Sequence, residues 1–335
     1  MNESTPITRR TRLVRLGAAV LFAITPAVAV LAVSSAGLDR PQQAIIYLSA
    51  HPDDEFQMWS VAETAPDEVH IFAVLTRGEQ TGFCEPDELE QSWQQELEPA
   101  PQPLPVGRWS AECAEARISS MAGWFDDISD VSDFAPTMIG GPSRIELDSG
   151  SDRLCREDEE GTCLPADAVD VYLDPAGRGS VVVFDLGDGD LEPDEVIWAV
   201  ERLLDDPRLG IAVDMPVAGI VGNYSTSGAA APLCFAYEHP DHRAIDDALW
   251  SHDFRVGFQA AATCALDPRR TLSLGVSDAA TDRAFAVVPT DDGALRRTGA
   301  HTANYGWLHP EFYPVDRVGQ AELFHQHQQF WVAHW

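Results

Sequence analysis

Apolar residues in this chain form short continuous runs, and these runs alternate with stretches in which apolar and polar positions follow helical spacing. The runs are rich in β-branched and aromatic residues, which predicts buried strands. We expect these strands at Ala44–Leu48, Val69–Leu75, Val181–Phe184 and Gly210–Asn223. The spacing predicts helices at Ala111–Phe125, Glu192–Leu204 and His239–Trp250.

Strands that alternate with helices, each strand a continuous apolar run, indicate a mainly parallel sheet with helices on both faces. The predicted fold class is therefore α/β, as a single domain over residues 37–335. Two polar stretches, 85–106 and 131–167, are expected to be loop insertions in this domain. The aromatic stretch His301–Pro314 is expected to be a packed loop, with a position facing the substrate as the alternative.

The first 36 residues have the pattern of a targeting segment. Four arginines precede an uncharged, mostly apolar stretch, 16–33, and small residues around Ala36 suit a cleavage site. This stretch is at the short end of what can span a bilayer. Residues 1–36 are therefore either a cleaved signal peptide or an N-terminal anchor with 16–33 as a membrane tether. In both cases the remainder is expected to be extracytoplasmic.

The charge balance limits the partners. Acidic residues number 54 and basic residues 22, which gives a net charge of −32. So negative a field disfavours nucleic acid and anionic membrane surfaces as partners. A small molecule or a glycan is the expected partner.

The six cysteines fit an exported protein, because an even number suggests disulfides in that compartment. Three bridges are expected, and Cys155 with Cys163 is the simplest pair, since these two flank one polar loop. The chain has no Cys-x-x-Cys, which argues against a zinc site made of thiolates.

Two similar polar elements carry the candidate chemistry. His51-Pro52-Asp53-Asp54-Glu55 follows the first predicted strand, and His239-Pro240-Asp241-His242 opens a predicted helix. Proline and acids in a first helical turn are also ordinary capping, so a structural reading is the alternative. Strand ends on one edge of a parallel sheet, however, are where α/β proteins build sites.

If both elements lie on that edge, His51, Asp54 and His242 form a catalytic zinc set with an open fourth position. Asp53 then suits a general base. His239 can face the same cavity and is the second candidate catalytic residue, since a protonated imidazole could hold the oxyanion. Asp241 either orients a histidine or caps the helix. Glu55 is expected to be a first-turn acid or a support for His51, with a role as metal ligand as the alternative. Zn²⁺ is the expected metal, although Fe²⁺ or another divalent ion could use the same ligands.

The paired elements resemble the LmbE-like family, the N-acetylglucosaminyl-phosphatidylinositol de-N-acetylases and their bacterial relatives. The resemblance covers residues 44–250 and implies a Rossmann-like sheet and zinc-dependent removal of acetyl from N-acetylated sugars. It also implies that Tyr237 contacts the substrate and assists catalysis. Leu75–Glu79 resembles the family's element after its second strand, which makes Arg77 a candidate substrate contact. Arg108 is the candidate for the family's substrate-binding arginine, although its spacing to Glu112 differs.

A weaker match to this family lies near the C-terminus, where His325–Gln328 resembles a His-x-Ser-Gln pattern with His327 in place of serine.

The predicted function is an exported metal-dependent hydrolase that removes the N-acetyl group from an N-acetylglucosamine-type sugar or glycoconjugate. The alternative is a catalytically inactive, metal-containing carbohydrate-binding or interaction module. A third possibility is a structural exported protein whose histidines and acids only cap helices.

The cysteine pattern yields a first testable prediction. In the exported protein, Cys155 and Cys163 should be linked, because they flank one short loop and an oxidising compartment favours the bond. Peptide mapping without reduction should recover the linked pair. Finding both residues alkylated as free thiols would refute the pairing and weaken the extracytoplasmic assignment.

Overall fold

The computed structural model describes residues 42–94, 101–147, 156–157, 163–164, 168–225, 237–263, 271–289, 295–308 and 327–333. The chain divides into two units, Met1–Ser35 and Ala36–Trp335, and every described residue belongs to the second. The predicted signal or anchor, residues 1–36, and the side chains of Cys155 and Cys163 lie outside the described part. No helix among the described residues combines the length and the hydropathy needed to cross a bilayer.

The centre of the fold is a nine-stranded sheet with the order β10-β13-β9-β8-β1-β2-β7-β6-β3. Five neighbouring strands run parallel, namely β9 (Phe258–Ala262), β8 (Val217–Gly222), β1 (Ala44–Ser49), β2 (Val69–Val74) and β7 (Gly179–Val183). The flanking strands pair antiparallel, and these are β6 (Ala168–Leu173), β3 (Ser143–Glu146), β13 (His327–Val332) and β10 (Thr271–Gly275). The prediction of a mainly parallel α/β sheet is confirmed.

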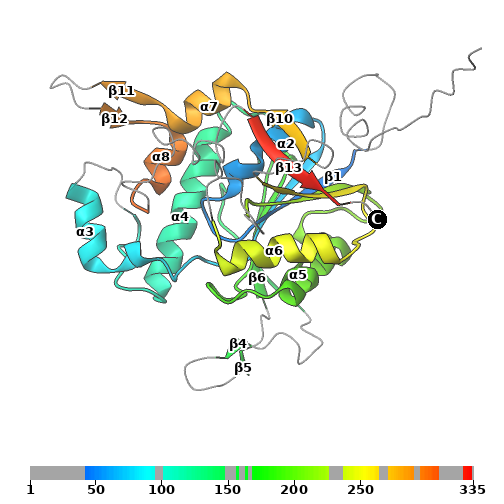
Figure 1. Cartoon of the computed structure of the whole chain (residues 1–335), viewed down its shortest axis with the longest axis horizontal. Coiled ribbons are helices and arrows are strands. Elements are labelled where there is room, and N and C mark those ends of the chain that lie inside the picture. The colour runs from blue at the N-terminus through cyan, green and yellow to red at the C-terminus, as the bar shows by residue number, and fades with distance from the viewer. Residues whose placement is uncertain are drawn as a thin grey trace, which may run out of the picture. The chain divides into compact units, whose positions relative to one another are not determined.

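Helices cover both faces of this sheet, and each face has its own apolar core. One core includes residues of α2 (Trp59–Thr64), α4 (Ala111–Ile128), α7 (Asp278–Phe285) and α8 (Ala300–Tyr305). The other includes residues of α5 (Pro193–Asp205) and α6 (Pro240–Ser251), which lie side by side in Figure 1. Helix α5 buries Val196, Ala199, Val200 and Leu203, which is the spacing of a single helical face.

The remaining elements are short. The described residues contain three 3-10 helices, η2 (Glu55–Met58), η3 (Gly82–Cys84) and η4 (Pro207–Leu209). Two small hairpins pair β4 (Arg156–Glu157) with β5 (Cys163–Leu164) and β11 (Val287–Pro289) with β12 (Leu295–Arg297).

Three stretches differ from the expected structure. Residues 85–106 were expected to form a loop, but they contain helix α3 (Pro86–Gln94), which begins with a proline and has Asp87 and Glu88 in its first turn. Both features stabilise a helix start and outweigh the polar composition. Within 131–167, β3 extends the sheet, and within 301–314 the chain forms most of α8.

The predicted strand at Gly210–Asn223 is correct only in its second half. The strand β8 begins at Val217, directly after Pro216, whose ring removes a backbone donor. The other predicted strands and helices agree with the structure to within three residues at each end.

The sheet topology determines where a site can form. Strands β1, β2 and β7 advance in one direction across the sheet, whereas β8 and β9 lie on the other side of β1. The order therefore reverses between β1 and β8, and ligands of open α/β sheets bind at such a point, beyond the carboxyl ends of the strands. His51 follows β1, and Asn223 and Tyr224 follow β8, at this edge.

A buried tyrosine–histidine pair links β1 to β2 elsewhere in the sheet. Tyr47 Oη lies 3.0 Å from His70 Nδ1, and both side chains are fully buried. Burial lowers the pKa of His70 from its ordinary value of 6.5 to about 4. At neutral pH the imidazole is therefore uncharged, and Tyr47 can donate its hydroxyl proton to it.

This shift predicts acid sensitivity of the fold. Below pH 6.5 the unfolded chain protonates His70 while the folded chain does not until about pH 4. Stability is therefore lost as the pH falls through this window, by roughly 1–2 kcal/mol between pH 7.5 and pH 5. Urea unfolding at both pH values should show this loss in the wild type and a smaller loss in His70→Gln. His252→Gln, at a partly exposed histidine, is the control; an equal pH dependence in wild type and His70→Gln would contradict the assignment.

Candidate metal centre

Three predicted metal ligands meet at the carboxyl edge of the sheet. His51 follows β1, Asp54 immediately precedes η2, and His242 lies in the first turns of α6. His242 Nε2 is 3.3 Å from His51 Nδ1 and 3.2 Å from Asp54 Oδ2, and His51 Nδ1 is 3.5 Å from Asp54 Oδ2. All three residues are buried.

These separations fit a tetrahedral metal. Zinc binds nitrogen and oxygen at about 2.0–2.1 Å, so two ligands of a tetrahedral ion lie roughly 3.3–3.4 Å apart. The three donor atoms thus form one face of such a tetrahedron, and the fourth position is open to a small ligand. A second group, His51, His239 and Asp241, also brings donor atoms together. In that group, however, His239 Nδ1 lies 3.9 Å from Asp241 Oδ2, and both carboxylate oxygens of Asp241 already accept backbone hydrogen bonds.

The hydrogen bonds around each imidazole leave the correct nitrogen for a metal. His242 Nδ1 lies 2.7 Å from both the carbonyl oxygen of Tyr224 and the side-chain amide nitrogen of Asn223, so Nε2 is the nitrogen that faces Asp54 and His51. His51 Nε2 lies 3.1 Å from carboxylate oxygens of both Asp188 and Asp241, so Nδ1 is the nitrogen that faces the other two ligands. Metal-binding histidines commonly donate their second N–H in this way.

Asp241 is a positioning residue for His51. Its two carboxylate oxygens accept hydrogen bonds from the backbone N–H groups of Gly189 and Leu191, at 2.8 and 3.1 Å. Together with the 3.1 Å contact to His51 Nε2, these bonds favour histidine orientation over helix capping for Asp241. Helix capping does not explain the neighbouring residues either, because the N-cap residues Asp54 and His239 make no side-chain capping hydrogen bond.

Asp188 is a further carboxylate at the site. It is buried, it contacts His51, and its Oδ2 accepts a hydrogen bond of 2.5 Å from the backbone N–H of Gln80. Asp188 follows β7 and Gln80 follows β2, so this bond ties the ends of two strands to the site. Burial would raise the pKa of Asp188, but the hydrogen bond and charge of His51 lower it.

The charges of the centre depend on one another. Burial would lower the pKa of His51, but hydrogen bonds to Asp188, Asp241 and Asp54 raise it well above the ordinary value. Burial would likewise raise the pKa of Asp54, yet His242 and His51 lower it well below its usual range. Buried carboxylates outnumber buried cations here, so a bound divalent cation would offset their repulsion.

Asp53 lies beside the metal ligands in a strained backbone conformation, with φ of 123°. Such a conformation persists only where neighbours enforce it. Arg117 on α4 does so, since its guanidinium donates to the carbonyl oxygens of Pro52 and Gly78 at 2.5 and 2.8 Å. The same guanidinium lies 3.0 Å from Asp53 Oδ1, and His301 Nε2 lies 3.0 Å from the Asp53 carbonyl oxygen.

Glu55 is a support for the loop rather than a ligand. It is fully buried, and its carboxyl group accepts from the hydroxyl group of Tyr305 and more weakly from the backbone N–H of Asp53. Burial, together with the charges of Asp53 and Asp54, raises the pKa of Glu55 to about 8. Its contact with Tyr305 shows that the 301–314 stretch reaches the site through helix α8.

A cavity of about 280 Å³ opens beside the ligands. Its lining includes the ligand His51, the predicted catalytic residues Asp53, Tyr237 and His239, and the predicted substrate residue Arg108. The other lining residues are Gln80, Thr81, Arg117, Asp188 and Leu308. Burial and the nearby His51 and His242 lower the pKa of His239 to about 4, and burial raises that of Tyr237.

One predicted substrate contact and one residue of the weak C-terminal match do not line the cavity. Arg77 does not line the cavity; its guanidinium lies 2.6 Å from Asp170 on β6 and 3.6 Å from Asp185. Gln328, from the weak C-terminal match, is buried away from the cavity, where it accepts from Ser60 N–H at 2.9 Å and donates to the Phe56 carbonyl oxygen. His325 lies outside the described residues.

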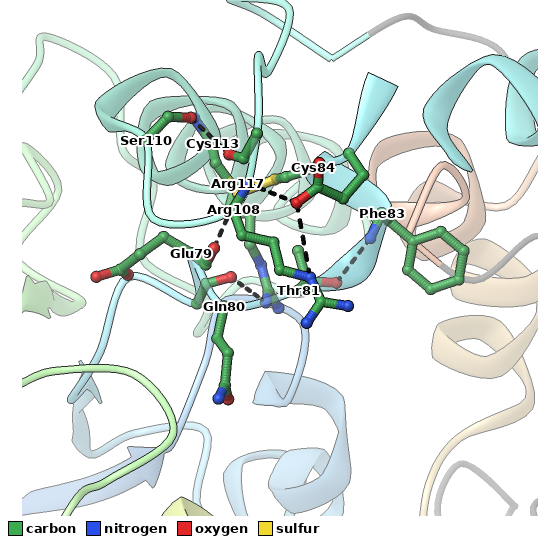
Figure 2. Close-up of a disulfide and its surroundings, with 12 residues drawn as sticks. Glu79, Gln80, Thr81, Phe83, Cys84, Arg108, Ser110, Cys113 and Arg117 are labelled. Atoms are coloured by element: carbon green, nitrogen blue, oxygen red, sulfur yellow. Dashed lines mark hydrogen bonds and ion pairs between the residues drawn. A yellow bond between two sulfur atoms is a disulfide. The ribbon is translucent and has the colours of Figure 1, made fainter. Parts of the chain in front are cut away.

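A disulfide between Cys84 and Cys113 braces one wall of the cavity. Cys84 ends η3 and Cys113 lies in the first turn of α4, and both are buried. Figure 2 shows the guanidinium groups of Arg108 and Arg117 on the same side of this bridge as Gln80 and Thr81. One of the three expected bridges is thus present, in a pairing that the sequence left open.

The residues that sequence reasoning missed are Asp188, Arg117 and His301. A signal existed only for Arg117. It lies four residues after Cys113 and four before Met121, on the apolar stripe of the predicted helix, where a charged side chain needs a buried partner. Asp188 lies in a glycine-rich turn, and His301 in a stretch with no repeated pattern.

No protein-family model and no curated protein matches the chain. Among solved structures it is similar to a deacetylase–bog complex in the biosynthesis pathway of teicoplanin, with 14% identity and a TM-score of 0.34. It is also similar to the zinc-inhibited form of teicoplanin deacetylase Orf2, with 13% identity and a TM-score of 0.32. Each comparison covers 87% of this chain and 97% of the other. At these values neither structure identifies the family of this chain.

The donor geometry predicts the effect of removing a ligand. His242→Ala should lose most of the bound divalent metal, because only two of the three protein donors, His51 and Asp54, then remain. The fold should survive, since the sheet does not depend on this ring. Elemental analysis after dialysis, with circular dichroism as the check on folding, measures both; His252→Ala at the other end of α6 is the control. Wild-type metal content in folded His242→Ala would show that the ligand set is wrong.

Proposed function

We propose that this chain is a metal-dependent hydrolase that removes the N-acetyl group from an N-acetylglucosamine-type sugar or glycoconjugate. The observation that carries the proposal is the position of Asp53. Its backbone conformation is strained, and its side chain lies beside three metal donors and lines the cavity. A metal site that served only structure would have no need of a carboxylate facing a cavity next to its open position.

His51, Asp54 and His242 would hold the metal, and Zn²⁺ is the first choice for two imidazoles and one carboxylate. When bound, such a metal supplies Lewis acidity and makes a coordinated water more acidic. Asp241 and Asp188 keep His51 oriented, and Tyr224 and Asn223 hold the Nδ1 side of the His242 ring. The positions of the ligands are therefore set before the metal binds.

Asp53 is the proposed general base. Arg117 lies 3.0 Å from its carboxylate and favours the ionised form, which can accept a proton. The hydrogen bonds of Arg117 and His301 to the backbone of this turn fix where that carboxylate points. General-base catalysis of this kind is typically worth 10²–10⁴-fold in rate.

Tyr237 and His239 are the proposed contacts of the acetyl group. Both line the cavity, and the His239 ring lies edge-on to that of His51 while the Tyr237 ring lies edge-on to that of His242. A tyrosine hydroxyl or an imidazole N–H can donate a hydrogen bond to the oxygen on which charge develops when an amide is attacked. Because His239 is uncharged in the metal-free protein, the earlier expectation of a protonated His239 is replaced by a neutral donor.

The sugar comes from the resemblance of the two His-Pro-Asp elements to the LmbE-like family. The cavity is compatible with it, since its volume is below the roughly 300–1,000 Å³ of drug-sized ligand sites and suits one sugar ring. Export through residues 1–36 would direct the enzyme to cell-wall, envelope or environmental glycans. The inactive metal-containing binding module remains the second candidate, and Asp53 is the residue that separates the two.

The test is acetate and free-amine release from N-acetylglucosaminides, chito-oligosaccharides and peptidoglycan fragments by metal-loaded protein. Asp53→Asn should retain the metal and lose turnover by 10²–10⁴-fold, because an amide cannot accept the proton. Asp190→Asn, at a solvent-exposed carboxylate, is the control. Near-normal turnover in Asp53→Asn would remove Asp53 from this role. Release from none of the substrates by the loaded wild type would favour the inactive module.

A further inference from the structure

The segment that leads into α4 carries an unusual concentration of exposed apolar side chains. Nine large hydrophobic side chains are exposed among the described residues, and three of them, Leu104, Val106 and Trp109, lie within six positions. Arg108, which directly precedes Trp109, lines the cavity. This segment therefore lies beside the opening of the proposed active site.

Trp109 is held in this place at an energetic cost. Its φ is 62°, in the left-handed region that disfavours bulky residues. Its backbone N–H donates to the carbonyl oxygen of Glu79 at 2.8 Å, and Glu79 directly precedes the cavity residues Gln80 and Thr81. Trp109 is 53% exposed, although burial would be the favourable state for a tryptophan.

The surrounding contacts make this turn rigid. The Cys84–Cys113 bridge joins the two ends of the segment, and Ser110 Oγ bonds the Gly107 carbonyl oxygen at 2.7 Å and the Cys113 N–H at 3.0 Å. Gly82 leaves room for the Arg108 guanidinium, since a Cβ there would lie 2.6 Å from its Nη2. Arg108 is thus positioned toward the cavity while Trp109 is presented to solvent.

A cavity that suits one sugar ring leaves the rest of a glycan outside. We propose that Trp109 is the stacking platform for a sugar ring adjoining the acetylated one, which makes the substrate an oligosaccharide or larger glycan. The C–H bonds on one face of a pyranose carry partial positive charge, and the face of an indole ring is negative. This inference rests on the proposed deacetylase function, which it extends from the reaction to the length of the substrate.

The experiment compares kcat/KM for N-acetylglucosamine, its β-1,4 dimer and trimer, and an alkyl glycoside of N-acetylglucosamine. Trp109→Gly removes the ring and relieves the strained backbone, so the fold should be retained. For the dimer and the trimer we expect it to lower kcat/KM roughly tenfold, as for a lost aromatic contact of about 1.4 kcal/mol. The values for the monosaccharide should stay unchanged, and Trp109→Tyr should retain most of the preference. Trp250→Ala, at an equally exposed tryptophan on α6, is the control.

Binding measured without turnover separates this inference from the proposed function. In the Asp53→Asn background, calorimetry should show weaker dimer binding once Trp109 is also changed to Gly. If dimer binding is weakened in this way but the wild type releases no acetate, the deacetylase function is rejected and the platform is kept. Three other outcomes, with deacetylation by the wild type, would keep the deacetylase and overturn the platform. In these, Trp109→Gly lowers kcat/KM equally for monosaccharide and dimer, lowers it for neither, or lowers it only for the alkyl glycoside.

Discussion

The ring of His51 is the contact on which the rest of the site depends. One nitrogen faces Asp54 and His242, and the other faces Asp188 and Asp241. These partners come from the loop after β1, the loop after β7 and the start of α6, so a single buried imidazole joins three separate parts of the fold. Because each buried carboxylate needs this ring or a backbone N–H to remain ionised, the loops cannot move independently.

The part of the fold that follows from local pattern could be predicted, and the part that follows from long-range contact could not. Continuous apolar runs gave the parallel strands, and the repeated His-Pro-Asp element placed the metal ligands, because both signals lie within a few residues. Asp188 becomes a site residue only because β7 and β1 end at the same edge of the sheet. Arg77 shows the converse. Its position after β2 suggested a substrate contact, but its guanidinium group pairs with Asp170 on β6.

Two strained residues lie at the two functional ends of the cavity. Asp53 and Trp109 both have positive φ; Arg117 of α4 holds the turn of Asp53, and Glu79 in the loop after β2 holds Trp109. Local strain of this kind has to be stabilised by the surrounding structure. In this protein the stabilising contacts are the buried Arg117 and the hydrogen bond between Trp109 and Glu79, and neither can be recognised from the residues that are strained.

Helix α4 has a consequence for how this protein could diverge. Cys113 and Arg117 lie one turn apart on it, and the first anchors the segment at the cavity rim while the second fixes the turn of Asp53. The exposed rim residues Leu104, Val106 and Trp109 can therefore be exchanged while Cys113 and Arg117 keep in place the helix that holds the base. Such an arrangement separates recognition from chemistry, so new glycan preferences could be grafted onto an unchanged reaction centre.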